Sequence, residues 1–500
     1  MSQIVVGTSA VDPADAPWPL AVCAVGGAAC LAAAIDISAG AFSPAALVAL
    51  TVALVAATLG VTLGRGVAGD LSSLAAIPVH RWVLAVVGLA LVYEFQVLLR
   101  SPDDAYFAVP QPQLEPLLRA ALAVAGVASL ATLVTSGRAR AACFALAVLI
   151  FVGLGVAIVA SGPNRQLDVW MFQHDASLGL LQGQNPYSLS YPDLYPGTSF
   201  YGPGLVRDGV LTFGFPYPPL GLVLVLPAQA LAGDFRYADV LALAVAAVLF
   251  AYAVRDAIGP PAALLFLFTP PVVLVLRQGW TEPLVVLAFA LLLFAVARAP
   301  RWLAVALGAV LAVKQYGFLL LPLSWRHLGA PRGDRRVRLR IVAAGLVVAA
   351  AVTVPFAIWD LDAFMRSVVL LQFEQPFRGD ALSYLVPLTG PDGAAPVWLV
   401  PLVVGAAYLL ALTRAPRTPA GFAAGAGLVF LVFFAFNKQA FANYYFLVIA
   451  MLAGAAALSR LPRPADARRP WPITGAARVG SDLTARGSPE LSDQAELDAA

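Results

Sequence analysis

Long apolar runs recur along almost the whole of this chain. About fourteen of them approach the length, roughly 17–25 residues, that an α-helix needs to cross a lipid bilayer. Only 12% of the residues are charged, about half the share that is usual in soluble domains. Backbone polar groups inside a bilayer must be satisfied within the spanning structure, which an α-helix achieves. The sequence therefore predicts an all-α, polytopic transmembrane helical bundle of about 12–14 spans. The candidate runs are 18–36, 44–64, 81–99, 116–136, 141–160, 217–233, 237–254, 261–276, 282–298, 302–325, 338–358, 395–413, 419–436 and 441–459.

Composition divides the chain into three parts. Residues 1–140 hold apolar runs with few polar residues and are interpreted as an N-terminal transmembrane scaffold module. Residues 141–460 combine apolar runs with two long polar loops, 161–216 and 359–394, and form the predicted catalytic membrane domain. The segment 461–500 is rich in Pro, Arg, Asp, Ser and Glu without apolar periodicity, which predicts a disordered cytoplasmic tail.

Basic residues in short loops predict the orientation of the chain. Lys and Arg concentrate on the cytoplasmic side of membrane proteins, and the strongest cluster here extends from Arg326 to Arg340. Counting crossings from this cluster places both long loops on the extracytoplasmic face of the cytoplasmic membrane. The pair Arg298 and Arg301 conflicts with the count, unless the run 302–325 is two half-helices that meet near Lys314. The sequence leaves both arrangements open.

The loop 161–216 contains a candidate catalytic carboxylate, Asp168. If the stretch 168–183 is a helix near the membrane surface, Asp168 and Asp175 are about two turns apart and share a face. His174 then points roughly 120° away, which argues against a three-ligand metal site. A carboxylate among aromatic residues at a membrane interface can have a raised pKa and act as a general base. The alternative is a solvated loop carboxylate.

Two further motifs follow in the same loop. Gly183 is expected to end the helix and Asn185-Pro186 to turn the chain. The side chains of Gln184, Asn185 and Tyr187 are suitable partners for sugar hydroxyls, although a plain helix cap is an equal alternative. Tyr217, in the motif Phe215-Pro216-Tyr217-Pro218-Pro219, is either a substrate contact or an interface anchor.

Ionisable residues in or beside the apolar runs are a third group of candidates: Lys314, Arg277, Glu282 and Lys438. A charge within a bilayer costs roughly 2.5–3.5 kcal/mol on insertion scales, so such a residue is a functional candidate by default. Several cations converging on one pocket suit a phosphate or pyrophosphate. Snorkelling towards the interface is the alternative. In the second long loop, Arg378 and neighbouring aromatic residues could line an acceptor groove.

Soluble-nucleotide motifs do not occur in this sequence. It has neither the Gly-Lys-Ser/Thr pattern of a P-loop nor a dinucleotide-binding glycine pattern. It also lacks a basic face with interleaved aromatic residues, so nucleic acid is not an expected partner. A phosphorylated substrate is therefore expected to arrive on a lipid.

The order of these motifs resembles that of polytopic membrane glycosyltransferases of the GT-C fold. It is most similar to the polyprenol-phosphate-mannose-dependent mannosyltransferases of glycosyltransferase family 87. The resemblance covers about residues 160–460 and rests on the following segments: Asp168-Val169-Trp170, Gly183 to Tyr187, Phe215 to Pro219, Arg277-Gln278-Gly279, Lys314 and Tyr444-Tyr445. The chain departs from the family in the spans that precede the acidic loop and in having Trp170 and Phe172 shortly after the Asp.

The resemblance implies an inverting transfer of a hexose, mannose in the first place, from a polyprenyl-phosphate sugar to a lipid or glycan acceptor. Asp168 would be the general base. Lys314, with Arg277 or Lys438, would stabilise the departing phosphate. Asp175, Gln184, Asn185, Tyr187, Tyr217, Glu282 and Arg378 would contact the substrates. No cofactor and no metal ion are expected.

Two other functions stay open on the sequence alone. A membrane transporter or lipid flippase for envelope polysaccharide precursors would explain the many spans and the intramembrane charges. A catalytically silent membrane assembly factor is the third possibility. Transporters often contain repeated halves with broken helices, and no such repeat is visible in the sequence.

Overall fold

The structure is a computed structural model of the 500-residue chain. It describes residues 17–64, 79–100, 113–162, 167–254, 256–327, 335–389 and 394–460. All of these lie in one unit, Met1–Leu461, to which the following description refers. The predicted tail 461–500 lies outside the described residues.

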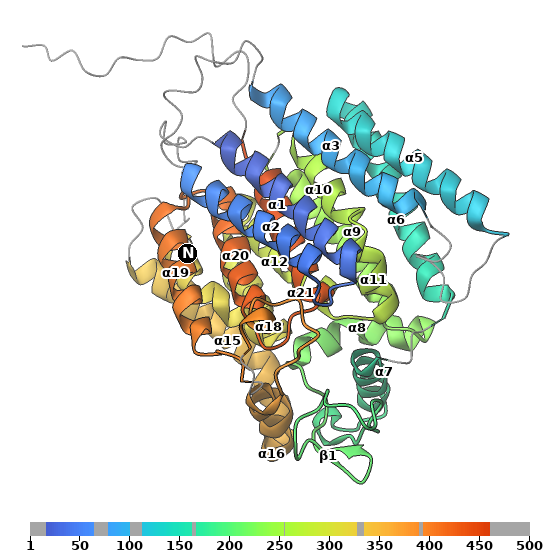
Figure 1. The fold of residues 1–500 in the computed structure, drawn as a ribbon, viewed down its shortest axis with the longest axis vertical. Coiled ribbons are helices and arrows are strands. Elements are labelled where there is room, and N and C mark those ends of the chain that lie inside the picture. Colours follow the sequence, from blue (N-terminus) through green and yellow to red (C-terminus); the bar gives the residue numbers. More distant parts are fainter. Residues whose placement is uncertain are drawn as a thin grey trace, which may run out of the picture. The chain divides into compact units, whose positions relative to one another are not determined.

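The described part of the chain is almost entirely helical, in agreement with the all-α prediction (Figure 1). Two short strands pair as an antiparallel hairpin. Helix starts follow ordinary capping: Ser43 and Thr418 each accept a backbone N–H through the side chain, and each precedes a proline at the first helical position. The elements in chain order are α1 (Pro17–Ser38), α2 (Pro44–Leu63), α3 (Val79–Arg100), α5 (Glu115–Val134), α6 (Gly137–Ala160), α7 (Asp168–Leu181), η1 (Pro186–Ser188), β1 (Val206–Arg207), β2 (Val210–Leu211), α8 (Pro219–Ala232), α9 (Arg236–Ala253), α10 (Gly259–Leu267), α11 (Pro271–Gln278), α12 (Glu282–Arg298), η2 (Pro300–Trp302), α13 (Leu303–Val313), η3 (Gln315–Leu320), α14 (Leu321–His327), α15 (Arg335–Trp359), α16 (Leu361–Phe364), the π-helical turn η4 (Met365–Leu370), α17 (Leu371–Glu374), α18 (Leu385–Leu388), α19 (Leu399–Arg414), α20 (Pro419–Ala435) and α21 (Ala442–Ala457).

Seven described helices are long and apolar enough to cross a membrane, namely α1, α2, α3, α5, α6, α9 and α15. The chain is a multi-pass membrane protein on this evidence of length and composition. The prediction that every apolar run is a full-length span is wrong, because several of the runs form shorter helices. The helix α8, for example, has 14 residues and extends about 21 Å, less than the roughly 30 Å of a hydrocarbon core. The short helices α20 and α21 are buried among other helices, so lipid thickness does not set their length.

Two predicted spans are broken, and only one of the breaks was expected. The run 302–325 divides at Lys314, whose backbone is extended between α13 and η3, as the half-helix alternative predicted. The run 261–276 was expected to be continuous, but α10 and α11 meet at an angle of 53°. Pro270 and Pro271 lie at this break, and prolines there lack the backbone N–H groups that a continuous helix needs.

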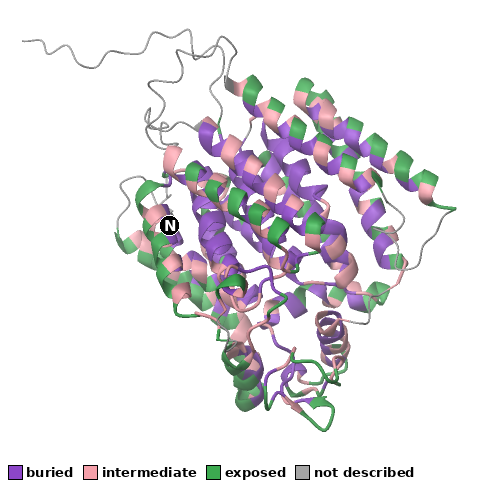
Figure 2. Cartoon of the chain, in the orientation of Figure 1, coloured by how far each residue is buried: buried purple, intermediate pink, exposed green. Residues whose placement is uncertain are grey.

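Helix packing joins the start of the chain to its end. The helix α1 packs against both α2 and α21, and α20 packs against α21 (Figure 1). The helix α9 packs against α12, and α13 packs against α15. Burial follows this arrangement: α20 and α21 are buried along almost their whole length (Figure 2). By contrast, only 11% of the most apolar part of α15 is buried, so most of the surface of this candidate span is not covered by other described parts of the chain.

A second, smaller hydrophobic core joins the described parts of the two long loops. Phe172 and Tyr187 from the first loop contact Phe364 and Leu371 from the second. The Ser188 hydroxyl donates to Asp360 (2.9 Å), and the Gly214 N–H donates to Ser367 Oγ (2.8 Å). We call this region, built from α7, the chain 182–217 and α16–α17, the loop layer. The loops predicted to share one side of the membrane therefore pack on each other.

Candidate functional site

Asp168 is the first residue of α7 and is enclosed by aromatic residues of the loop layer. Its Oδ2 accepts a hydrogen bond from the Tyr201 hydroxyl at 2.8 Å, and its Oδ1 accepts one from the Val169 N–H at 2.8 Å. The Asp168 N–H donates to the Tyr195 hydroxyl at 3.1 Å. A helix N-terminus favours a carboxylate, and the predicted helix 168–183 is present as Asp168–Leu181.

Burial raises the pKa of Asp168 above the ordinary aspartate value. The hydrogen bonds from Tyr201 and Val169 and the positive charge of Arg378 act in the opposite direction without cancelling the effect of burial. Burial and the neighbouring Asp168 also raise the pKa of Tyr201, so the tyrosine stays protonated and donates. Asp168 is thus a half-buried carboxylate with a raised pKa and one strong hydroxyl donor, a combination that suits proton transfer.

Arg378 brings a positive charge to the same place. Its guanidinium lies 3.5 Å from the centre of the Phe200 ring and 5.0 Å from that of Phe441. It also makes two hydrogen bonds, of 2.8 and 2.7 Å, to the Asp380 carboxylate. These bonds lower the pKa of Asp380 and keep it ionised. Arg378 is therefore held in a fixed position within electrostatic range of Asp168.

Lys314 forms a buried ion pair with Glu282 at the break between α13 and η3. Its Nζ lies 3.1 Å from Glu282 Oε1 and 2.5 Å from Thr281 Oγ1. The Tyr316 hydroxyl donates to the same Glu282 oxygen at 3.0 Å. The Lys314 ammonium also lies 4.0 Å from the centre of the Tyr217 ring, which makes a cation–π contact. The snorkelling alternative is excluded, because the Lys314 side chain is only 5% exposed.

Two tyrosines connect the Lys314–Glu282 pair with Asp168. Tyr217 and Tyr444 are each close enough to interact electrostatically with both Glu282 and Asp168. The ring of Tyr444 stacks on Phe434, and its edge meets Tyr316. The general-base candidate and the cation candidate, which are 146 positions apart in sequence, thus belong to one polar neighbourhood at the boundary between the loop layer and the helices. We call this neighbourhood the central site.

The Phe215-Pro216-Tyr217 segment is fixed by its neighbours. The Pro216 carbonyl accepts from Gln315 Nε2 (2.7 Å), and the Tyr217 carbonyl accepts from the Tyr187 hydroxyl (2.9 Å). Gly214 permits the close approach of the chains, because a Cβ there would lie 2.0 Å from the Tyr187 carbonyl oxygen. Tyr187 is 1% exposed, so its predicted role as a substrate contact is replaced by that of a support for Tyr217.

Several other predicted substrate contacts lie away from the central site. Asn185 accepts the Tyr187 N–H and caps η1, which is the plain-cap alternative. Gln184 is exposed beyond the end of α7, and Gly183, with φ of +77°, ends that helix as predicted. Asp175 is half-exposed and pairs with His174 at 2.9 Å. Glu282, by contrast, belongs to the central site as the buried partner of Lys314.

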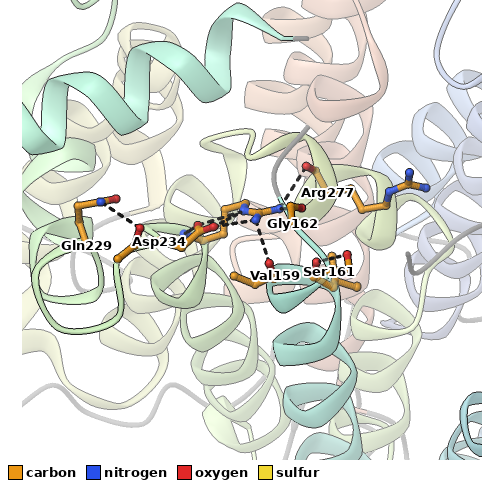
Figure 3. Close-up of polar contacts among 9 residues, drawn as sticks. Val159, Ser161, Gly162, Gln229, Asp234 and Arg277 are labelled. Atoms are coloured by element: carbon orange, nitrogen blue, oxygen red, sulfur yellow. Dashed lines mark hydrogen bonds and ion pairs between the residues drawn. The ribbon is translucent and has the colours of Figure 1, made fainter. Parts of the chain in front are cut away.

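The predicted cations Lys438 and Arg277 do not converge on Lys314 in the contacts described. The Lys438 ammonium donates to the carbonyls of Gln375 (2.6 Å) and Phe373 (3.2 Å), and thereby holds the chain that carries Arg378. Arg277 offers its carbonyl to Arg236 at 3.5 Å, while its side chain points away from that network (Figure 3). The central cation is therefore Lys314, and Arg378 is a second cation within electrostatic range of Asp168.

The sequence interpretation missed a second buried ion pair, Arg236 with Asp234. Arg236 is fully buried, and its guanidinium makes three hydrogen bonds of 2.7–3.1 Å to Asp234. It also donates to the carbonyls of Val159, in the last turn of α6, and of Gly162, just after that helix (Figure 3). An Asp-x-Arg sequence directly after Gly233, at the start of an apolar run, was the available signal.

Other missed residues are the tyrosines and hydroxyls that surround the predicted ones. Tyr195 and Tyr201 contact Asp168, and Thr281 contacts Lys314, each across a long separation in sequence. No local motif indicates such contacts. In the described ranges, no group of three or more His, Cys, Asp or Glu side chains is placed to hold a metal ion. Searches of family models, of curated proteins and of solved structures found no match to this chain.

Proposed function

We propose that this protein is a GT-C-like membrane glycosyltransferase that moves a hexose from a polyprenyl-phosphate sugar to a lipid or glycan acceptor. The observation that carries the proposal is the central site: Tyr217, whose ring contacts the buried Lys314, and Tyr444 both lie within electrostatic range of the half-buried carboxylate of Asp168 and of Glu282. A base and a cation in one neighbourhood are what attack on a sugar phosphate requires. Mannose is the sugar implied by the motif resemblance.

In the proposed reaction, Asp168 accepts the proton of an acceptor hydroxyl. The acceptor oxygen forms a bond to the anomeric carbon as the bond from that carbon to the phosphate oxygen breaks. Polyprenyl phosphate leaves with the bonding electrons, and the anomeric configuration inverts. Lys314 stabilises the negative charge that develops on the phosphate, and Glu282 and Thr281 hold its ammonium group in place. Arg378 lies near Asp168 and is available to contact the acceptor or the phosphate.

The orientation is also a proposal, supported by the charges at the two ends of α15. Arg335, Arg336, Arg338 and Arg340 lie at its first turns, and the loop layer follows its last residue, Trp359. The rule that basic residues stay inside places the arginines in the cytoplasm. The central site would then open on the extracytoplasmic side of the cytoplasmic membrane.

Replacement of Asp168 tests the proposal. In membranes supplied with a polyprenyl-phosphate sugar, Asp168→Asn should lower the rate of sugar transfer about 10²–10⁴-fold, the usual contribution of a general base. The matched control is Asp175→Asn, which removes a half-exposed carboxylate from the same helix and should leave transfer nearly unchanged. An Asp168→Asn protein that is made in normal amounts and transfers sugar at the wild-type rate would refute the assignment.

A transporter or lipid flippase is the second candidate function. The observation in its favour is the pair of helix breaks, between α10 and α11 and at Lys314, because transporters bind substrates at discontinuous helices. Purified protein in liposomes distinguishes the two functions. Movement of a labelled polyprenyl-phosphate sugar across the bilayer without product formation would favour the flippase, and a glycosylated product would favour the transferase.

A further inference from the structure

The chain Leu361–Glu374, which forms α16, η4 and α17, carries large apolar side chains on two opposite faces. One face is buried in the loop layer and consists of Ala363, Phe364, Ser367, Val368 and Leu371. The opposite face also carries large apolar side chains. Leu361 is 62% exposed, Leu370 is 45% exposed and Phe373 is 80% exposed. Both faces of this segment are therefore apolar, although only one of them packs on protein in the described structure.

The exposed apolar side chains continue from the end of α15. Ile358 and Trp359, the last two residues of that helix, are 78% and 48% exposed. Single exposed apolar residues are common on proteins, but a run that follows one surface over several turns indicates an interaction site. Because α15 is a candidate membrane span whose most apolar part is only 11% buried, the surface that extends it is continuous with a surface suited to lipid.

The length of α15 places the segment relative to the bilayer. Its arginines end at Arg340, and the apolar part, Ile341 to Trp359, comprises nineteen residues. At 1.5 Å per residue this part is about 28 Å long, which matches a hydrocarbon core of about 30 Å. Trp359 therefore reaches the far interface, where tryptophan is enriched. Leu361 and the residues after it begin at the level of the lipid headgroups.

We propose that the exposed face of α16–α17 is a membrane-docking surface that lies in the headgroup and upper acyl region of the leaflet next to the loop layer. We call it the docking face and define it by Leu361, Met365, Leu370 and Phe373. Its exposed ionic residues are Asp362 and Arg366, which pair with each other, and Glu374, which leaves the segment without a net positive charge to attract anionic lipid. The contact is accordingly apolar and does not depend on anionic lipid.

Docking of this face fixes the depth of the central site relative to the membrane. Ser367 on the opposite face accepts the Gly214 N–H, three residues before Tyr217. Asp360, at the start of α16, caps the helix and accepts the Ser188 hydroxyl. A lipid-embedded docking face thus holds the loop layer at the bilayer surface. This inference concerns lipid contact and stands whether or not the protein transfers sugar.

Spin labels measure the proposed contact directly. In a variant with Cys23, Cys30 and Cys143 replaced by Ala, a nitroxide is attached at Phe373→Cys and the protein is placed in nanodiscs of zwitterionic lipid. We expect high collision rates with oxygen and low rates with a water-soluble nickel complex. The lipid-facing reference is Val347→Cys in α15, and the water-facing reference is Arg207→Cys in the β-hairpin.

Two results overturn the proposal. A label at position 373 as accessible to nickel as the label at 207 places the face in water. A label shielded from both reagents places it against protein, and a second copy or another partner then covers it. A second measurement keeps all cysteines: a photoreactive benzoylphenylalanine at position 373 should form adducts with lipid. Adducts with protein, or none, count against the docking face.

Discussion

Arg236–Asp234 and Lys314–Glu282 are both buried ion pairs, but they differ in how fully their hydrogen-bonding groups are used. Arg236 donates to both oxygens of Asp234 and to carbonyls of Val159, Gly162 and Arg277. In the other pair, the second carboxylate oxygen of Glu282 has no partner among the described residues. The ammonium group of Lys314 meets one carboxylate oxygen, one hydroxyl and the face of an aromatic ring.

The difference separates a structural pair from one that has capacity for a ligand. Carbonyls at a helix C-terminus lack intrahelical partners, and a buried guanidinium satisfies several of them at once. Arg236 therefore fastens the end of α6 to the chain near α11. A pair with unsatisfied groups costs more to bury unless another molecule completes it. The incomplete pair is the one that lies beside Tyr217, which is itself within electrostatic range of Asp168.

The largest expected effect is on stability and comes from Arg236. Arg236→Met leaves Asp234 and at least two carbonyls without their donor, so we expect the free energy of unfolding to fall by about 3–5 kcal/mol. Arg366→Met, which breaks an exposed pair with Asp362, is the control and should cost less than about 1 kcal/mol. Denaturant unfolding in detergent measures both. If Arg236→Met unfolds at the wild-type denaturant concentration, the pair does not support the fold.

For the Lys314–Glu282 pair, we expect the main loss to be in sugar transfer and not in stability when both residues are replaced. Lys314→Met alone leaves Glu282 buried and unpaired, which confounds stability with function. The double variant Lys314→Met/Glu282→Gln removes both charges, so it should recover the stability that the single variant loses. Sugar transfer should stay about 10²–10³-fold below wild type, since the phosphate loses its cation. Recovery of transfer together with stability would show that Lys314 serves only the fold.

The sequence predicted those features that depend on local composition. Apolar length located the helices, and the lone lysine in the run 302–325 marked a real break in the helix. Gly183 ended α7 as expected, because its positive φ is a property of the residue itself. Lys314 was identified from the cost of a charge within a bilayer, and Asp168 from its place among aromatic residues at a predicted membrane interface; both arguments depend only on the neighbouring sequence.

Features that depend on distant contacts were not accessible in this way. Nothing near Tyr201 indicates that its hydroxyl meets a carboxylate 33 positions earlier. A tyrosine is a residue type that often contacts sugars, but Tyr187 is buried where the backbone at Gly214 packs against it. Glu282 and Lys438 were identified by charge alone, and the sequence did not indicate their protein partners, which are Lys314 for Glu282 and backbone carbonyls for Lys438. The bend at Pro270 was missed because the apolar pattern continues through it.

The smallest expected effect concerns Asp168, which is intermediate between the two pairs because each of its oxygens has one donor. Burial raises the pKa of Asp168, and the Tyr201 hydroxyl is the strongest of the groups that lower it. Tyr201→Phe should therefore raise the pKa of Asp168 further. A general base works when ionised, so transfer is lost as the pH falls through this pKa, and in the variant the loss should begin at a higher pH. The lost hydrogen bond, worth about 1.5 kcal/mol, corresponds to roughly a tenfold lower rate on the acidic side.

Tyr195→Phe is the matched control for this test. Tyr195 accepts from the Asp168 N–H and contributes less to the pKa of the carboxyl group than Tyr201 does. The acidic side of the pH–rate profile of Tyr195→Phe should shift to higher pH, as in Tyr201→Phe, but by a smaller amount. The measurement is the rate of sugar transfer against pH for the wild type and both variants. Equal shifts in the two variants would mean that general loosening of the loop layer, rather than the hydrogen bond to Oδ2, sets the ionisation of Asp168.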